Sequence, residues 1–219
     1  MSWPLAILGL GLALASAGGA LAQTVPGKPP AANVQRLGEY IRTPEHLRAV
    51  GAAIAAFEPA VLQAGCTDVK PVKGRSWQPV EDPVFEGAAT APNNAAWQES
   101  WDVTACGKPV VRNLGFVARP GEGVVPLPMF PGDSLADLKL QEEAGQMALD
   151  TVAPGALGCT QGKIQVIAST VTDRAEYARG KWSERWTAAG CSRTVDIDAD
   201  FLPGPTGRPT YGFRAGKAR

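Results

Sequence analysis

The sequence predicts an α+β protein made of two tandem homologous repeats, each a helix followed by a three- to four-stranded antiparallel sheet with one disulfide. Three observations lead to this fold class. A block of rare residue types occurs twice, apolar spacing changes from helical to alternating within each copy, and two cysteines fall at matching places in each copy. The chain of 219 residues is long enough for two small domains.

The repeat is carried by a Trp-x-Glu-x-Trp block, which spans 97–101 in the first copy and 182–186 in the second. Cys-Thr-x-x-Lys blocks precede these and begin at Cys66 and Cys159. A cysteine, a valine and a phenylalanine follow each block at the same offset of 85 residues: Cys106, Val110 and Phe116, then Cys191, Val195 and Phe201. We therefore expect repeat 1 over 43–118, a linker over 119–133 and repeat 2 over 134–203.

Residues 1–22 predict a signal peptide. They are apolar from Leu5 and end in Ala-Leu-Ala before Gln23, a pattern typical of signal-peptidase cleavage. No Lys or Arg precedes the apolar run, which departs from the usual signal-peptide pattern. The alternative is an uncleaved anchor, because 18 weakly apolar residues can barely span a bilayer. After cleavage we expect no integral membrane span and a periplasmic or secreted protein, in a compartment where thiols are oxidised to disulfides.

The segment 23–42 is expected to be a linker or a short helix. A longer helix should follow, because Thr43 suits the N-cap and Pro44 the first helical position. Pro59 is expected to kink or interrupt this helix. Apolar residues at three- and four-residue steps predict its buried face: Leu47, Val50, Ile54, Phe57 and Val61.

After each Cys-Thr block the period shifts toward two, which predicts strands over Val69–Trp77 and Lys163–Val171. Segments Val124–Met129 and Thr210–Arg214 are candidates for fourth strands, which prolines confine to the sheet edges. In the first repeat, the strand that follows Val69–Trp77 alternates between an aromatic and a polar face. Trp97, Glu99, Trp101 and Val103 share the aromatic face, and Gln98, Ser100, Asp102 and Thr104 the polar one.

The second repeat is expected to begin with a helix that has Ser134 as its N-cap and extends to about Val152. Residues 204–219 contain four basic residues and no acidic one, which predicts a mobile basic tail that can include an edge strand. Asp196, Asp198 and Asp200 alternate along a strand and are expected to form a solvated acidic face, because the glycine and glutamate of a calcium-binding loop are missing.

The cysteines predict one disulfide per repeat, Cys66–Cys106 and Cys159–Cys191. In each repeat the first cysteine precedes one strand and the second follows the next, and those ends lie side by side in an antiparallel pair. A zinc site normally needs close Cys-x-x-Cys pairs, which the sequence lacks. With His46 as the one histidine, we expect no metal and no cofactor.

Glu99 and Glu184 are candidate functional residues, because the aromatic face of their strands should pack on the helix and bury them. A buried carboxylate must be paired, hydrogen-bonded or protonated. One interpretation is structural, with Lys70 or Lys163 as ion-pair partners or indole N–H groups as donors. The other is a groove in which indoles stack on a sugar, peptide or aromatic group. The candidate ligand-binding residues are Trp97, Glu99, Trp101, Trp182, Glu184 and Trp186.

The block Gly132-Asp133-Ser134-Leu135 resembles the one that names the GDSL esterase family, in which the serine is the nucleophile. That resemblance implies a histidine base downstream, and no histidine follows Ser134. Because a serine without a base is a poor nucleophile, we interpret Ser134 as a helix cap. His46 is expected at the surface or in the first turn of a helix.

The chain has 21 basic and 21 acidic residues, so its charge gives no reason to expect nucleic-acid binding. The sequence shows no activated nucleophile, metal cluster or phosphate loop. We therefore expect a non-enzymatic binding or protein-interaction module, whose partner is an unidentified protein or envelope component. The alternatives are an envelope enzyme with Glu99 and Glu184 as acid and base, and a structural envelope protein. The architecture resembles that of secreted β-lactamase inhibitor proteins, which by itself implies no function.

Overall fold

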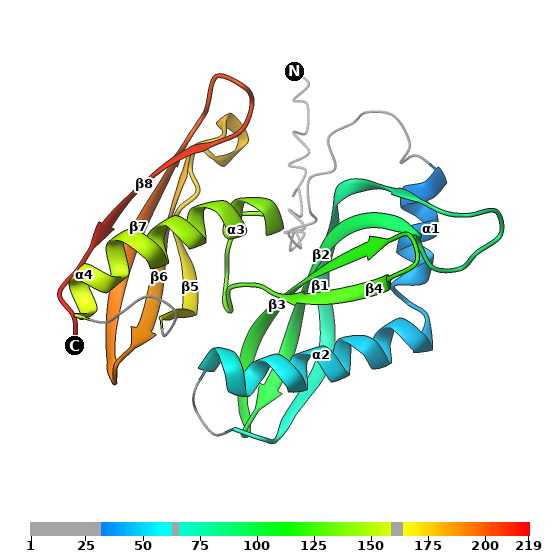
Figure 1. The fold of residues 1–219 in the computed structure, drawn as a ribbon, viewed down its shortest axis with the longest axis horizontal. Coiled ribbons are helices and arrows are strands. Elements are labelled where there is room, and N and C mark those ends of the chain that lie inside the picture. The colour runs from blue at the N-terminus through cyan, green and yellow to red at the C-terminus, as the bar shows by residue number, and fades with distance from the viewer. Residues whose placement is uncertain (1–31, 63–65, 159–163) are drawn as a thin grey trace, which may run out of the picture.

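The computed structural model describes residues 32–62, 66–158 and 164–219; the predicted signal peptide and Cys159 lie outside them. The chain is an α+β protein with two four-stranded antiparallel sheets. Helices α1 (Ala32–Tyr40) and α2 (Pro44–Leu62) precede the first sheet. Helix α3 (Leu138–Met147), the π-helical turn η1 (Ala148–Val152) and helix α4 (Ala153–Leu157) precede the second. Figure 1 shows the sheets side by side, with α2 against the first and α3 and α4 along the second.

Both sheets follow the order of the chain. The first consists of β1 (Val69–Val84), β2 (Asn94–Ala105), β3 (Lys108–Arg119) and β4 (Gly123–Pro128). The second consists of β5 (Gln165–Asp173), β6 (Trp182–Gly190), β7 (Arg193–Leu202) and β8 (Thr210–Ala215), with the 3₁₀ turn η2 (Tyr177–Arg179) between β5 and β6. The fourth strands expected from the sequence are therefore confirmed, and both lie at an edge.

Each sheet has its own hydrophobic core. On the first sheet, α1 and α2 cover the aromatic face, where the rings of Trp97 and Phe116 stack with centroids 5.2 Å apart. On the second, α3 and α4 cover Trp182 and Phe201, whose centroids are 4.5 Å apart. The two pairs also correspond in register, since Trp97 is opposite Phe116 and Trp182 opposite Phe201. The alternation predicted for the tryptophan-bearing strands is thus confirmed.

The Cys66–Cys106 disulfide forms as predicted, with a Cα–Cα distance of 5.9 Å and 40 residues between the cysteines. Closing a loop of this length stabilises the fold by roughly 4 kcal/mol in the chain-entropy model. The second predicted bridge includes Cys159 and so falls partly outside the described residues.

Of the buried stripe predicted for α2, Val50 and Ile54 are buried and Phe57 is partly buried, while the side chain of Val61 lies outside the described residues. Leu47 is 42% exposed, whereas His46 is completely buried. The stripe therefore consists of His46, Val50, Ala53 and Ile54, which recur at helical spacing. His46 lies in the first turn, as expected, but its expected exposure is wrong. Pro59 does not end the helix, which continues to Leu62.

The helix expected from Ser134 begins later. Asp137 is the N-cap of α3, and its side chain accepts a hydrogen bond from the N–H of Leu140 at 2.9 Å. Ser134 lies before the helix and its hydroxyl has other partners, described below. The cap expected at Ser134 is therefore wrong.

The C-terminal stretch contains the edge strand that was a candidate from the sequence, and it is attached to the second sheet. Strand β8 pairs with β7, and Thr194 and Arg219 exchange backbone hydrogen bonds of 2.9 and 2.8 Å. Two ion pairs join this stretch to the acidic face of β7, Asp196 with Arg219 and Asp200 with Arg214, while Asp198 pairs with Arg185 of β6. Each exposed pair is worth at most about 1 kcal/mol.

Candidate functional site

Glu99 lies at the centre of a buried polar cluster on β2. Its Oε1 accepts from Trp97 Nε1–H at 2.8 Å and lies 2.6 Å from His46 Nε2, and its Oε2 accepts from Trp101 Nε1–H at 2.9 Å. The two tryptophans flank Glu99 on the same strand face, so both indoles can turn toward it. Three N–H donors on two oxygens satisfy an ionised carboxylate. With Nε2 of His46 as a donor to Glu99, the buried Nδ1 has no hydrogen-bond partner among the residues that the structure describes.

Glu184 is the counterpart on β6 and has no exposed surface. Its carboxylate accepts five hydrogen bonds. Two come from the indole N–H groups of Trp182, at 2.9 Å, and Trp186, at 2.8 Å. The others come from the hydroxyl of Ser134 at 2.8 Å and from the backbone N–H groups of Leu135 and Ala136 at 2.8 and 3.2 Å. The Gly-Asp-Ser-Leu block thus places its serine as a donor to a buried carboxylate.

Both glutamates connect the tryptophans of a strand to the start of a helix. His46 is the third residue of α2, and residues 134–136 directly precede the N-cap of α3. Indole N–H groups act as donors in both clusters, as the structural interpretation predicted. The ion pair expected with Lys70 is wrong, because Lys70 binds Asp68 at the surface with a distance of 2.7 Å. Lys163 lies outside the described residues.

The structure does not bring Glu99 and Glu184 together. They lie on different sheets, and each is surrounded by the aromatic residues of its own core. Of the six candidate ligand-binding residues, Trp97 and Trp186 have no exposed surface, and Trp182 is 5% exposed. Glu99 borders the cavity described next, and Trp101 borders a second, smaller one beside Gly74.

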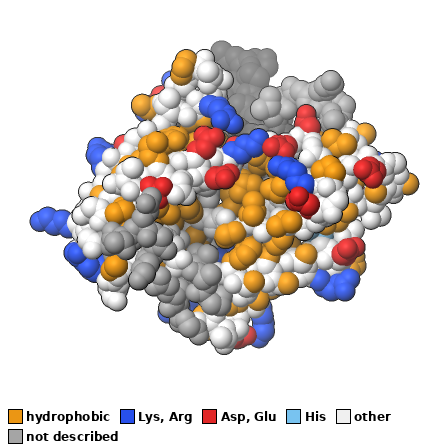
Figure 2. Space-filling model, in the orientation of Figure 1, with side chains coloured by type: hydrophobic (Ala, Val, Ile, Leu, Met, Phe, Trp, Pro, Cys, Tyr) orange, Lys and Arg blue, Asp and Glu red, His pale blue; other side chains and the backbone are white. Residues whose placement is uncertain are grey.

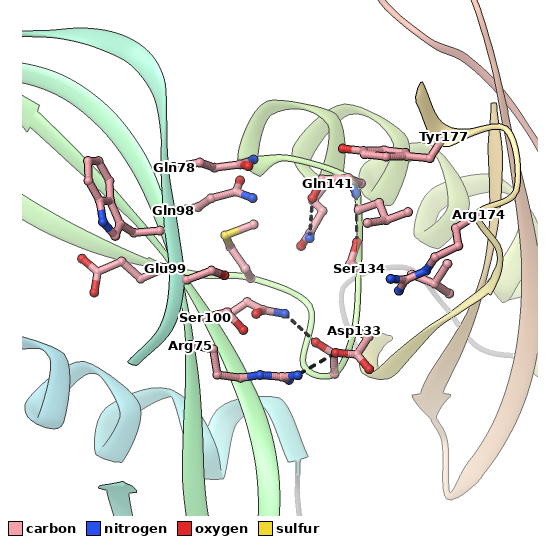
Figure 3. A pocket seen from close by; sticks show the side chains of 18 residues that line it. Arg75, Gln78, Gln98, Glu99, Ser100, Asp133, Ser134, Gln141, Arg174 and Tyr177 are labelled. Atoms are coloured by element: carbon pink, nitrogen blue, oxygen red, sulfur yellow. Dashed lines mark hydrogen bonds and ion pairs between the residues drawn. The ribbon is translucent and has the colours of Figure 1, made fainter. Parts of the chain in front are cut away.

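A cavity of about 520 Å³ lies between the two sheets. One wall is the polar face of the first sheet, where Ser76, Ser100 and Asn113 form one row across β1, β2 and β3. Gln78 and Gln98 form the next row. The opposite wall comes from the end of β5, the residues that follow it and the segment before α3. Figure 3 shows Gln78, Gln98 and Ser100 opposite Arg174 and Tyr177, with the carboxylate of Glu99 turned away from the cavity.

The floor of the cavity is the segment 130–133, which bridges the two sheets. On one side, the N–H of Gly132 donates to Val111 of β3 at 3.2 Å, and Asn113 donates to two carbonyls of the segment. On the other side, Ser169 of β5 exchanges backbone hydrogen bonds with Pro131 and Asp133 at 2.7 and 3.0 Å. The segment therefore holds the walls of the cavity at a fixed spacing.

Helix α3 also contacts the first sheet. The N–H of Leu138 donates to Gln98 Oε1 at 2.8 Å, and the Leu138 side chain lies against Gly115, where a Cβ would be 2.6 Å from its Cδ1. An ion pair of 2.9 Å joins Lys139 to Glu81 of β1. Figure 2 shows acidic and basic side chains next to one another across the middle of this face.

The charges that line the cavity are unequally compensated. Arg75 lies 3.3 Å from Asp133 and 3.6 Å from Asp102. Glu99 is occupied by its three N–H donors. Burial, followed by the carboxylates of Asp137 and Glu184, raises the pKa of Tyr177, so its hydroxyl remains a proton donor through the neutral range. In the part of the chain that the structure describes, the guanidinium of Arg174 has no ion-pair partner.

The sequence analysis did not identify Gln78, Gln98, Arg174 or Tyr177 as site residues. The alternation of β2 was a partial signal, because it placed Gln98 and Ser100 on a polar face. Nothing in the sequence showed that the segment before α3 would lie against that face. The ion pair between Glu58 of α2 and Arg112 of β3, in which two guanidinium N–H groups bind one buried carboxylate, was also missed.

Comparison with known proteins adds no relationship: no protein family, curated protein or solved structure matches the chain. Among the described residues, no three histidine, cysteine, aspartate or glutamate side chains gather as a metal site. None of the helices in residues 32–62, 66–158 and 164–219 is long and apolar enough to cross a membrane.

Proposed function

We propose that the protein is a non-enzymatic binding module of the periplasm or extracellular space, and that its ligand binds in the cavity between the two sheets. The observation that carries this proposal is the composition of the cavity walls. Amide, hydroxyl and guanidinium groups from both sheets face one space of about 520 Å³, which is within the range of roughly 300–1,000 Å³ typical of small-molecule sites. Hydrogen-bonding groups that face an open space suit a polar ligand.

The tryptophan–glutamate clusters have a supporting role in this proposal. Their indole N–H groups are bound to Glu99 and Glu184, so they are not available to a ligand. The clusters fix the helix starts against the sheets. Glu99 forms part of the wall of the cavity, and its strand neighbours Gln98 and Ser100 project into it from the opposite face.

The extracytoplasmic location is supported by the leader-like residues 1–22 and by the Cys66–Cys106 disulfide, since disulfides persist in oxidising compartments. The protein partner or envelope component expected from the sequence remains a proposal, as does the structural alternative. An enzyme with Glu99 and Glu184 as acid and base gains no support from the geometry, because the two carboxylates lie in separate cores and are occupied by N–H and O–H donors.

We also propose that the two halves, 43–118 and 134–203, are copies of one ancestral unit. The offset of 85 residues shared by the Trp-x-Glu-x-Trp blocks and the residues that follow them, the common strand order and the corresponding register of Trp97 and Trp182 support it. A duplicated unit accounts for the indole donors that the two glutamates share. Their partners near the helix differ, His46 for Glu99 and Ser134 for Glu184.

The test is a ligand screen by two-dimensional ¹H–¹⁵N NMR with a chemically broad set of small molecules that includes sugars, amino acids, short peptides and organic acids. We expect at least one compound to shift the resonances of cavity residues such as Gln78, Gln98 and Ser100. The Ser100→Trp variant fills the cavity and should abolish these shifts. Thr104→Trp is the matched control, because Thr104 lies on the same face of β2 and does not line the cavity.

Two results would contradict the proposal. One is a screen in which no compound shifts the cavity resonances. The other is a ligand whose binding survives Ser100→Trp but is lost in Thr104→Trp, which would place the site elsewhere on the sheet.

A further inference from the structure

The walls of the cavity differ in charge compensation, and this difference indicates a class of ligand. Arg75 is shared between Asp133 and Asp102, at 3.3 and 3.6 Å, and the carboxylate of Glu99 is held by its N–H donors and turned away from the space. Arg174 lines the same cavity without an ion-pair partner among the described residues, and Figure 3 shows its guanidinium directed into the space. Arg174 is therefore the charged group of the walls that is available to a ligand of opposite charge.

The orientation of the Gln98 amide adds a hydrogen-bond donor. Its Oε1 accepts the N–H of Leu138 at 2.8 Å, which fixes the oxygen toward α3 and leaves the NH₂ group for the cavity. The hydroxyl of Tyr177 retains its proton, because burial and neighbouring carboxylates raise its pKa. Figure 3 shows these two groups on opposite sides of the space that Arg174 enters.

Part of the remaining wall is apolar. Met129, Leu135 and Val171 line the cavity with apolar atoms that can contact a short carbon chain. Indole carbons of Trp77 lie against Gly38 of α1, where a Cβ would be 3.1 Å from Cζ2. The free guanidinium of Arg174 is a planar fork that donates two parallel hydrogen bonds, which suits a planar, singly charged acceptor, and a carboxylate has this geometry.

We propose that the cavity between the two sheets binds a small organic carboxylate, whose carboxylate group pairs with Arg174 while the amide of Gln98, on the opposite wall, donates to another oxygen of the same ligand. This inference rests on the proposed function and names the ligand class of the same site. Met129, Leu135 and Val171 contact the carbon skeleton of the ligand, and the hydroxyl of Tyr177 donates to a further oxygen.

The experiment compares acids with neutral counterparts of similar shape. Succinate, N-acetylalanine and galacturonate are titrated into the purified protein, and so are succinamide, N-acetylalaninamide and galactose. Binding is measured by calorimetry and by the NMR shifts of the Gln98 side-chain amide and the Arg174 Nε–H. We expect at least one acid to bind at least about tenfold more tightly than its neutral counterpart, and binding to weaken as salt increases.

Two variants test the residue assignments. Arg174→Gln should weaken the best acid by at least about tenfold and remove most of its advantage over the neutral counterpart. Gln98→Glu keeps an acceptor for the N–H of Leu138 but adds a negative charge to the cavity, and should weaken the acid by a similar factor. Arg179→Gln is the control, since Arg179 lies in the adjacent turn, is 82% exposed and does not line the cavity; it should leave binding unchanged.

The outcomes separate this inference from the proposed function. If a neutral compound shifts the cavity resonances as strongly as its acid, or if Arg174→Gln and Arg179→Gln have equal effects, the carboxylate assignment is overturned and the cavity remains a binding site. If none of the three acids binds, the assignment is likewise overturned. If, in addition, no compound of the broader screen shifts the cavity resonances, the proposed function fails as well.

Discussion

Replacement of Glu184 by glutamine tests whether the tryptophan–glutamate cluster supports the fold of the second half. The change keeps the shape of the side chain and replaces one carboxylate oxygen by an NH₂ group. The Oε2 of Glu184 accepts from Ser134 and Trp186, and the Oε1 from three N–H groups. If the NH₂ group takes the place of Oε2, the hydroxyl of Ser134 can rotate to accept from it, but the indole of Trp186 is a donor only.

The magnitude follows from these contacts. One buried donor without an acceptor costs about 1–3 kcal/mol, and the hydrogen bonds that remain lose the contribution of a charged acceptor, which is about 1 kcal/mol each. Removal of a buried charge offsets part of this cost. We expect Glu184→Gln to lower the free energy of unfolding by about 2–4 kcal/mol.

The measurement is urea unfolding followed by tryptophan fluorescence, with Glu122→Gln as the control. Glu122 is exposed in the β3–β4 turn, and its replacement should change the free energy of unfolding by less than about 0.5 kcal/mol. Trp186→Phe removes the donor that the amide cannot satisfy. The double variant should therefore be more stable than the sum of the two single effects predicts, by about 1 kcal/mol. A Glu184→Gln protein as stable as the Glu122→Gln control, or strict additivity, would refute the reasoning.

Three further predictions concern Gly132 in the segment that joins the two sheets, the contact of His46 with Glu99, and the ion pair of Lys139 with Glu81. Gly132→Ala should lower the free energy of unfolding, measured in urea, by about 2 kcal/mol or more, because φ is 100° and a Cβ would lie 2.2 Å from the carbonyl oxygen of Ser169. Gly121→Ala is the control. Its φ is 80° but a Cβ there would have no atom within 4 Å, so the change should cost only about 1 kcal/mol. His46→Leu should cost about 1–2 kcal/mol in the same assay, since it removes a donor to Glu99 and also a buried Nδ1 without a partner; a stability equal to wild type would contradict the geometry. A hydrogen bond from Lys139 lowers the pKa of Glu81 below its ordinary value of 4.5, so the pair should stabilise the fold above about pH 4.5 and lose this effect as the pH falls through the lowered pKa. The free energies of unfolding of wild type and Lys139→Gln, measured by urea unfolding, should accordingly differ at pH 6 by less than about 1 kcal/mol, with wild type the more stable, and should converge near pH 3. A difference that grows toward low pH would contradict this sign.

The strands were predictable from the sequence because their signals are local. Alternation along 97–104 determines which side chains share a face whatever the strand packs against, and the cysteine positions follow from the geometry of an antiparallel pair. Strand β1 was expected to end at Trp77 and continues to Val84. Its extension depends on pairing with β2 across register shifts, which a one-strand pattern does not show.

The helix face was predicted less well because a histidine is not counted as apolar. His46 is buried through its contact with Glu99, 53 residues away in the chain, and this contact rotates the buried stripe so that Leu47 faces outward. The Ser134 cap failed for a related reason. Its hydroxyl donates to Glu184, 50 residues away, and leaves the cap to Asp137. Both errors come from polar partners that are distant in sequence.

The cavity could not be predicted because it requires the relative placement of the two sheets. That placement depends on Gly132, whose N–H reaches Val111 while the adjacent residues pair with Ser169. The sequence indicated only a Gly- and Pro-rich linker. The polar face of β2 was visible in the sequence, but its interpretation as a solvated surface or as a cavity wall depends on what lies opposite.

The polar faces of the two sheets have different partners, and this difference explains why only the polar face of the first sheet lines the cavity. On the second sheet, polar residues of β6 bind the aspartates of β7, so the face is compensated within the sheet: Thr187 with Asp196, Arg185 with Asp198 and Ser183 with Asp200. At the positions 85 residues earlier, β3 has no aspartates but Val111, Asn113 and Gly115. Asn113 instead binds the bridging segment, and Gly115 leaves room for Leu138. Because no carboxylate of β3 engages Gln98 or Ser100, these side chains can bind a ligand.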